Sequence, residues 1–166
     1  MKKLLRPLGL FLIVTLVVMQ FFQSEKNNNV SATAVASDIN RIYPLPADVQ
    51  EVLQKSCYDC HSNNTDYPWY DNVQPVSWWL HRHIAEGKKE LNFNEFASYR
   101  IGKQFEKLEE ITEQIKDDEM PLSSYTLIHT DAKLSPEKKT LVIQWAGNLR
   151  DSIRATYPAD SLVKKK

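Results

Sequence analysis

Cysteine and glycine are both scarce in this chain of 166 residues. The only two cysteines are Cys57 and Cys60, so any thiol chemistry uses this pair, and a zinc site with a second cysteine pair is excluded. Four glycines stand against long runs of helix-forming residues, and no internal repeat or strand-like alternation is evident. The sequence therefore predicts an all-α fold, with helices joined by short turns marked by proline.

A net charge is also absent, because 21 lysine and arginine residues balance 21 aspartate and glutamate residues. The chain as a whole has no electrostatic field that would recruit nucleic acid, and no nucleic-acid partner is predicted. Five aromatic residues occur close together at Tyr67, Trp69, Tyr70, Trp78 and Trp79. Without a basic surface, these rings are better interpreted as walls of a cofactor crevice than as a platform for stacking bases.

The one long apolar run lies near the N-terminus, from Leu8 to Phe22. With the residues before it, the run approaches the hydrocarbon thickness of a bilayer, so residues 1–23 are predicted to form a transmembrane anchor. A cleaved signal peptide is the alternative, but the nearest small-x-small triplet, Ala34-Val35-Ala36, comes late for a cleavage site. No cysteine follows the run, which excludes lipid attachment at a signal cysteine.

The basic residues Lys2, Lys3 and Arg6 precede this apolar run and predict its orientation. Positive charges favour the cytoplasmic side of a membrane, so everything after Phe22 is expected on the far side. The predicted localisation is the cytoplasmic membrane, crossed once, with the C-terminal domain on the periplasmic side.

The rest of the chain has room for one small domain, not two full ones. Residues 24–40 are polar and small without an apolar period, which predicts a flexible linker. Residues 41–158 are assigned to the helical domain, and residues 159–166 to a basic C-terminal tail.

Apolar residues at helical spacing locate the helices of this domain. A helix beginning near Pro46 leads straight into Cys57, and its buried face is predicted as Val49, Val52, Leu53 and Ser56. A helix beginning at Pro75 is expected to end near Gly87, and its inward side is predicted as Val76, Trp79, Leu80 and His83.

Two further helices follow nearer the C-terminus. The first has the repeat Ile101, Phe105, Leu108, Ile111 and Ile115. In the second, Ser135 is an N-cap and Pro136 takes the first helical position. Its apolar face is predicted as Leu141, Val142, Trp145, Leu149 and Ile153.

The segment Cys57-Tyr58-Asp59-Cys60-His61 has the C-x-x-C-H spacing of covalent haem attachment. Two intervening residues match the separation of the two haem vinyl groups when the segment ends a helix. The adjacent His61 is then placed beneath the ring, where it ligates the iron. The motif predicts one covalent haem c, held by Cys57 and Cys60, with His61 as proximal axial ligand. Covalent haem attachment in bacteria takes place on the periplasmic side, in agreement with the predicted topology.

Two other uses of this cysteine pair fit the sequence less well. A thioredoxin-like redox disulfide requires a neighbouring pattern of strand and helix, and no strand-like run flanks the motif. A zinc site requires two more ligands, and His81 and His83 are only two residues apart, closer than in a zinc finger.

Met120 is the candidate for the distal axial ligand, since a thioether is a common sixth ligand of electron-carrying haem. The other methionines, Met1 and Met19, lie in the predicted anchor. Pro121 favours an extended conformation at Met120 and prevents a helix from continuing through it. The alternative is that Met120 only fills the core.

Histidine is the competing type of distal ligand. His81, His83 and His129 are available, and bis-histidine ligation would lower the reduction potential. A histidine of this kind is more often a core or surface residue with a hydrogen-bond partner, so Met120 is favoured.

An all-helical domain whose first helix ends in C-x-x-C-H is the plan of a small monohaem cytochrome c. Several strings of this sequence also resemble the bacterial haem-binding domain family of cytochrome c type, over roughly residues 42–145. These strings include Cys57 to Asn63, Tyr67 to Tyr70, Pro75 to Trp79, Leu91-Asn92-Phe93, Met120-Pro121-Leu122, Tyr125 and His129. The resemblance implies covalent haem c at Cys57, Cys60 and His61, with Met120 in the position of the distal ligand.

The function predicted from these features is that of a one-electron carrier tethered to the membrane, and not of an enzyme. Such a carrier has two partners, the membrane through its N-terminal helix and a redox partner protein of unknown identity. One alternative is a haem-based sensor or peroxidase-like enzyme with an open distal site, for which His83 or His129 is the candidate acid or base. Another is a structural partner of a larger complex, in which haem mainly stabilises the fold.

Overall fold

The computed structural model describes residues 2–28 and 36–163 of the chain. Regular secondary structure within these ranges is helical, and the only bridge between extended residues there joins Asn28 to Asn64. The predicted all-α fold is confirmed.

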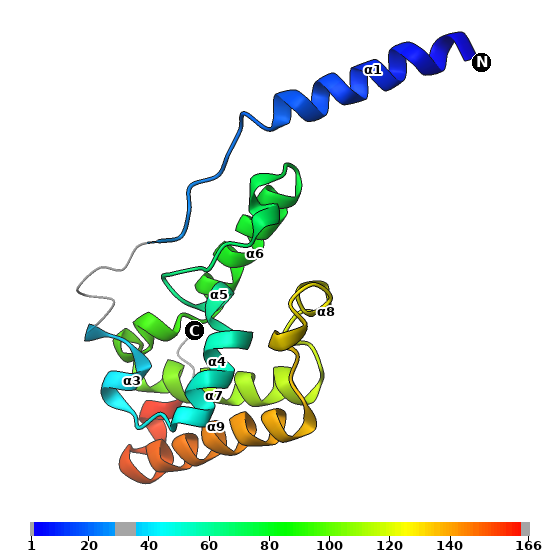
Figure 1. Ribbon diagram of the computed structural model, residues 1–166. Coiled ribbons are helices and arrows are strands. Elements are labelled where there is room, and N and C mark those ends of the chain that lie inside the picture. Colours follow the sequence, from blue (N-terminus) through cyan, green and yellow to red (C-terminus); the bar gives the residue numbers. More distant parts are fainter. Residues whose placement is uncertain (1, 29–35, 164–166) are drawn as a thin grey trace.

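Five longer helices account for most of the described chain (Figure 1): α1 (Lys2–Met19), α4 (Ala47–Ser56), α6 (Val76–Glu90), α7 (Ile101–Lys116) and α9 (Pro136–Thr156). The shorter helical segments are α3 (Ile39–Ile42), α5 (Tyr58–His61), η1 (Trp69–Asn72), η2 (Phe93–Ser98), α8 (Ser123–Thr126), η3 (Thr130–Ala132) and η4 (Ala159–Leu162).

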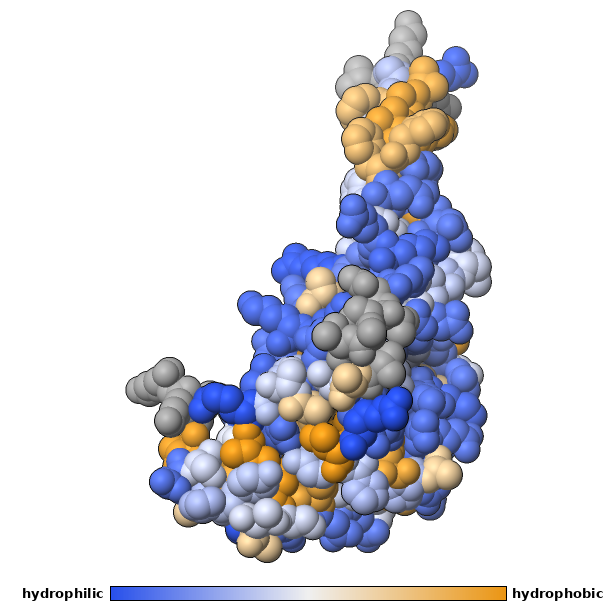
Figure 2. Space-filling view, turned by 90° about the vertical axis from the view of Figure 1, so that its left-hand side faces the viewer, coloured by the Kyte–Doolittle hydropathy of each residue, from blue (hydrophilic) through white to orange (hydrophobic). Residues whose placement is uncertain are grey.

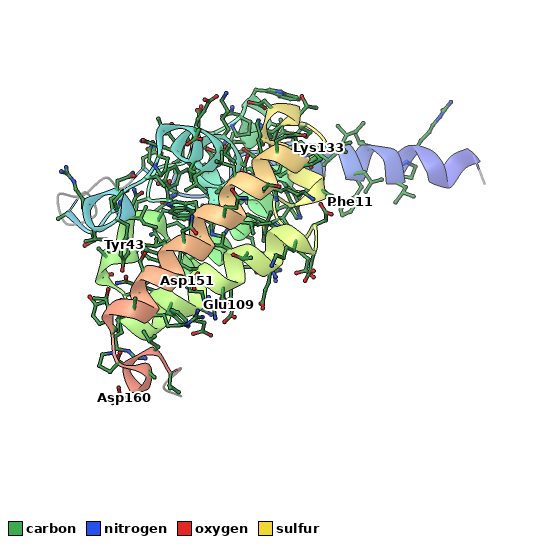
Figure 3. The ribbon with its side chains drawn as sticks, turned by 90° about the horizontal axis from the view of Figure 1, so that it is seen from below. Phe11, Tyr43, Glu109, Lys133, Asp151 and Asp160 are labelled. Carbon is green, nitrogen blue, oxygen red and sulfur yellow. The ribbon has the colours of Figure 1, made fainter. Side chains whose placement is uncertain are left out.

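The main hydrophobic core lies where α7 and α9 run side by side and α4 packs against α9 (Figure 1). Its deepest large side chains are Phe93, Phe96, Ile39, Leu53, Leu108, Val49 and Val142, each less than 2% exposed. Viewed from below, Glu109 on α7 and Asp151 on α9 mark the two adjacent helices (Figure 3). Next to Asp151, Arg150 bonds Glu109 at 2.5 Å across this interface. The α7–α9 pair forms a base above which the shorter helices are arranged.

The predicted start of α9 is confirmed by its cap. The Ser135 hydroxyl accepts a hydrogen bond from the backbone N–H of Lys138 at 3.3 Å, and Pro136 occupies the first helical position. The predicted repeat of α7 is confirmed too, because Leu108, Ile111 and Ile115 are buried.

The predicted inward face of α6 is wrong in part. The helix buries Ser77, Leu80 and Ile84, whereas Val76 and Trp79 are 40% and 43% exposed. The physical reason is that α6 packs against η1 and α5, away from the main core, so a different stripe faces the protein. Nor does α6 end at Gly87, because it continues to Glu90.

The helix α1 extends away from the domain, and its apolar side chains are open to the surroundings (Figures 1 and 2). Phe11, labelled on α1 in Figure 3, is 66% exposed. The predicted transmembrane anchor at residues 1–23 is not supported: in the part of the chain that the structure describes, no helix combines the length and apolarity needed to cross a membrane.

The predicted linker, residues 24–40, lies partly outside the described residues. Of its described ends, Asn27 is hydrogen-bonded to the domain, and Ile39 is fully buried at the start of α3. The described part of the predicted tail, residues 159–163, contains η4, which packs against α7 at Gly102.

Candidate functional site: the cysteine–histidine motif

The C-x-x-C-H motif begins at a break between two helices. The last residue of α4 is Ser56, and the Cys57 backbone leaves helical geometry at φ −130° while its N–H still bonds Leu53 O at 2.9 Å. The Cys57 carbonyl then accepts the N–H groups of Cys60 at 3.1 Å and His61 at 2.9 Å. The motif therefore closes into one tight turn of helix, α5, at the end of α4.

The orientation of His61 is fixed from the far side of its ring. Its Nδ1 lies 2.9 Å from the carbonyl oxygen of Leu91, the residue that follows α6. Because a carbonyl oxygen only accepts, Nδ1 carries the proton and Nε2 keeps its lone pair. Burial also lowers the pKa of His61, which favours the neutral imidazole. A neutral, oriented imidazole is the form that ligates a metal.

Two adjoining cavities, of about 300 and 310 Å³, open beside this motif. Both are lined by Cys57, His61, Glu90 and Met120. The first is otherwise walled mainly by apolar residues of the core, among them Leu53, Leu91, Phe93, Ile111 and Ile115. The second is bounded by Cys60 of the motif, by α6 and by the segment Met120–Tyr125. The structure thus brings all four predicted site residues, Cys57, Cys60, His61 and Met120, to one region.

Met120 reaches this region through the way in which α7 ends. Asp117 caps the helix, and Asp118 adopts a left-handed conformation with φ 60°, which reverses the chain. The N–H of Met120 then bonds the carbonyl of Gln114 at 3.1 Å. The turn holds Met120 beside the end of α7 and over both cavities, while Pro121 leads the chain away.

The loop after Met120 is fastened to the motif by a hydrogen bond. The hydroxyl of Tyr125 donates to Oδ2 of Asp59 at 2.6 Å, and Asp59 is one of the two residues between the cysteines. The Tyr125 ring stacks on His129 at 4.3 Å, and His129 Nε2 lies 2.8 Å from the hydroxyl of Tyr70. Sequence reasoning missed this connection, since nothing in the spacing relates Asp59 to Tyr125.

Gly87 permits α6 to approach the motif closely. A Cβ at this position would lie 2.8 Å from the carbonyl oxygen of Cys60 and 3.2 Å from its Cβ. Any larger residue would therefore push α6 and α5 apart. The sequence does show an isolated glycine inside a helical pattern at this position. Here the glycine marks close packing of α6 on the motif and not the end of the helix.

The segment that follows the motif is held by a network of amides. The side chain of Asn92 donates to Oδ1 of Asn63 at 2.8 Å, and the N–H of Asn63 donates to Asn94 at 2.8 Å. Asn27 bonds the same segment from the N-terminal side, donating from its side chain to Ser62 O and to Thr65 Oγ1, each at 2.9 Å. These bonds secure the chain that directly follows His61.

The three competing histidines differ in position. His81 bonds the buried Asp71 at 2.9 Å and stacks on Tyr67, and His129 is engaged as described above. Only His83 of these three lines a cavity that contains Met120, and its Nδ1 donates to Trp79 O at 2.8 Å.

The aromatic residues predicted to wall the crevice lie elsewhere. In the described part of the chain, neither cavity is lined by Tyr67, Trp69, Tyr70, Trp78 or Trp79. Tyr70 packs instead with Leu80 and Ile84 in a second, smaller core, against which Cys60 and Tyr67 also lie. The aromatic side chains at the cavities are Phe93 and Tyr125. This prediction was wrong because nearness in sequence does not fix the face of a helix.

The surroundings of both thiols disfavour the thiolate form. Burial raises the pKa of Cys57 to about 12 and that of Cys60 to about 11, whereas reactive cysteines have a lowered pKa. Both cysteines are free. Among residues 2–28 and 36–163, no group of three or more His, Cys, Asp or Glu side chains is placed to hold a metal ion.

A family model described as a haem-binding domain matches residues 14–148. The chain belongs to this haem-binding domain family. No curated protein and no solved structure gives a significant match. The match covers the motif, Met120 and both cavities, so the family assignment made from the sequence strings is confirmed, as is haem as the cofactor.

The residues of this haem-binding domain fit a haem. A neutral imidazole, a thioether and two thiols border the same pair of cavities, and the larger part of the first wall is apolar. Iron in haem takes histidine nitrogen and methionine sulfur, and a porphyrin requires an apolar lining.

Proposed function

We propose that this protein carries one covalent haem c and acts as a one-electron carrier. Cys57 and Cys60 would form the thioether bonds, and His61 and Met120 would be the two axial ligands. The observation that best supports the proposal is the hydrogen bond from His61 Nδ1 to Leu91 O, which leaves Nε2 as the metal-binding atom beside a cavity shared with Met120.

The bound haem would supply an iron centre that gains and releases a single electron. The residues of the chain would hold this haem through His61 and Met120 and would exclude water from it. Leu91 fixes the imidazole, the turn at Asp118 holds Met120, and the bond from Tyr125 to Asp59 ties the Met120 loop to the motif. With two strong ligands in place, no position remains for a substrate, so a carrier is favoured over an enzyme.

We also propose that α1 holds the carrier at a membrane, with the haem-binding domain on the periplasmic side. Leu10, Phe11 and Ile13 are each more than 60% exposed, and an apolar helix that the rest of the described chain leaves uncovered needs an apolar environment. Covalent haem attachment in bacteria takes place on the periplasmic side, which supports this location of the domain.

Optical spectra test the ligand assignment. The oxidised wild-type protein should show a weak sulfur-to-iron charge-transfer band at the red end of the spectrum, and Met120→Ala should lose it. Met19→Ala, which removes a thioether far from the cavities, is the matched control and should keep the band. A wild-type spectrum without the band, or a band that survives Met120→Ala, would exclude the assignment.

A haem-based sensor or peroxidase-like enzyme is the second candidate. The observation that favours it is His83, which borders the same cavity as Met120 and could serve as a distal acid or base. This function requires an open distal position, so the reduced wild-type protein would bind carbon monoxide and change its spectrum. The carrier proposal predicts no such change unless Met120 is replaced.

A further inference from the structure

The segment of the domain nearest α1, residues 67–80, exposes no charged side chain of its own. Between Tyr67 and Leu80 the sequence contains one charged residue in fourteen, Asp71, although a quarter of the whole chain is charged. The Asp71 side chain is only 3% exposed. It is neutralised by Lys26 at 3.5 Å and bonded by His81 and Ser77.

The same segment exposes apolar and indole side chains. Trp69 is 78% exposed, and Val73, Val76 and Trp79 are between 40% and 44% exposed. Val76 and Trp79 are three residues apart on α6 and share a face. We call these four residues the tryptophan tip.

Direct hydrogen bonds connect the segment that carries the tryptophan tip, through Gln74 and Trp78, to the end of α1. The Gln20 side chain pairs with the backbone of Gln74, accepting from its N–H at 2.9 Å and donating to its carbonyl at 3.2 Å. Trp78 Nε1 donates to the carbonyl of Phe22 at 2.8 Å. Phe21 and Phe22 are themselves 81% and 63% exposed. Because the two segments are joined, the water or lipid that surrounds the last turn of α1 also surrounds the tryptophan tip.

We propose that the tryptophan tip docks into the headgroup layer of a phospholipid bilayer. This inference rests on the proposed attachment of α1 to a membrane. Tryptophan is enriched at this layer because its ring is apolar and its N–H is polar, and a tip without charge can enter the layer without an unpaired ion. Polar residues lie directly below the apolar helix (Figure 2), as expected at the level of the headgroups. The domain would then have one fixed orientation on the membrane.

Fluorine NMR of the full, haem-loaded chain tests the proposal. The protein is labelled with fluorotryptophan, bound to vesicles of phosphatidylcholine and phosphatidylglycerol, and exposed to a lipid-embedded nitroxide or a water-soluble gadolinium chelate. The Trp69 signal, assigned with Trp69→Phe, should broaden several-fold more with the nitroxide than the signal of Trp145, which is 8% exposed in the core. The soluble chelate should broaden the Trp69 signal less than it does without vesicles.

A matched pair of variants adds a second readout. Val73→Glu places a charge on the tip and should reduce the nitroxide effect on Trp69 several-fold. Leu127→Glu changes an exposed apolar residue outside the tip and should leave the effect unchanged. If the chain binds vesicles but the Trp69 signal broadens only with the soluble chelate, the docking of the tryptophan tip is excluded, while the attachment of α1 to the membrane still stands. If the chain does not bind vesicles, the attachment of α1 to a membrane is excluded, and the docking of the tryptophan tip is excluded with it.

Discussion

At the scale of single residues, the sequence predicted four side chains that the structure brings together at one pair of cavities, but not the residues that position them. Cys57, Cys60, His61 and Met120 could be chosen because their types and spacing are specific to haem chemistry. The carbonyl of Leu91 could not, because every residue has a carbonyl and only the fold decides which one meets His61.

The close contact at Gly87 leads to a prediction about stability. Gly87→Ala should strain the packing of α6 on the motif by about 1–3 kcal/mol, since the new Cβ would meet the Cys60 carbonyl at 2.8 Å. Gly147 in α9 is the matched control, because a Cβ there has no atom within 4 Å. Gly147→Ala should therefore raise the free energy of unfolding by about 0.5–1 kcal/mol. Chemical denaturation of the haem-loaded proteins measures both, and equal stabilisation by the two changes would refute the contact.

The bond between Tyr125 and Asp59 gives a second residue-level prediction. Tyr125→Phe keeps the stacking on His129 but removes a hydrogen bond to a carboxylate, a loss of about 1.5–3 kcal/mol. Thermal unfolding should occur at a lower temperature, and exogenous imidazole should displace Met120 more readily. Tyr157→Phe, at the partly exposed tyrosine after α9, should change neither quantity. Indistinguishable behaviour of the two variants would mean that this bond does not hold the loop.

At the scale of secondary-structure elements, prediction succeeded where a helix covers the main core and failed where it does not. The repeats of α7 and α9 match their buried faces, because one broad apolar stripe meets one core. The helix α6 packs instead on η1 and α5, so its buried stripe includes Ser77 and approaches Cys60 at Gly87. Hydrophobicity alone could not identify that face.

The cap of α9 provides an element-level prediction. Ser135→Ala removes the bond to the N–H of Lys138 and should lower the free energy of unfolding by about 1 kcal/mol. Ser152→Ala, near the C-terminal end of the same helix, removes only a bond to the carbonyl four residues earlier and should be neutral or slightly stabilising. The two variants are compared in urea titrations. A Ser135→Ala protein as stable as the wild type would show that α9 does not depend on this cap.

At the scale of the whole molecule, the sequence predicted an apolar N-terminal helix and a separate domain but not how they are joined. Gln20, Phe22 and Asn27 each bond to the domain, through partners more than thirty residues away in the sequence. Such pairings of polar groups carry no periodic signal, and only the folded chain reveals them. The same holds for the pair of cavities, which require α4, α6 and the end of α7 together.

The most direct test of the account is the mass of the denatured full chain, purified from cells that attach haem to proteins of this kind. We predict that the wild-type chain exceeds the mass of its amino acids by one haem. The double variant Cys57→Ser, Cys60→Ser should have the mass of the polypeptide alone. A wild-type chain that also has only the polypeptide mass, with any haem lost on denaturation, would contradict covalent attachment at this motif.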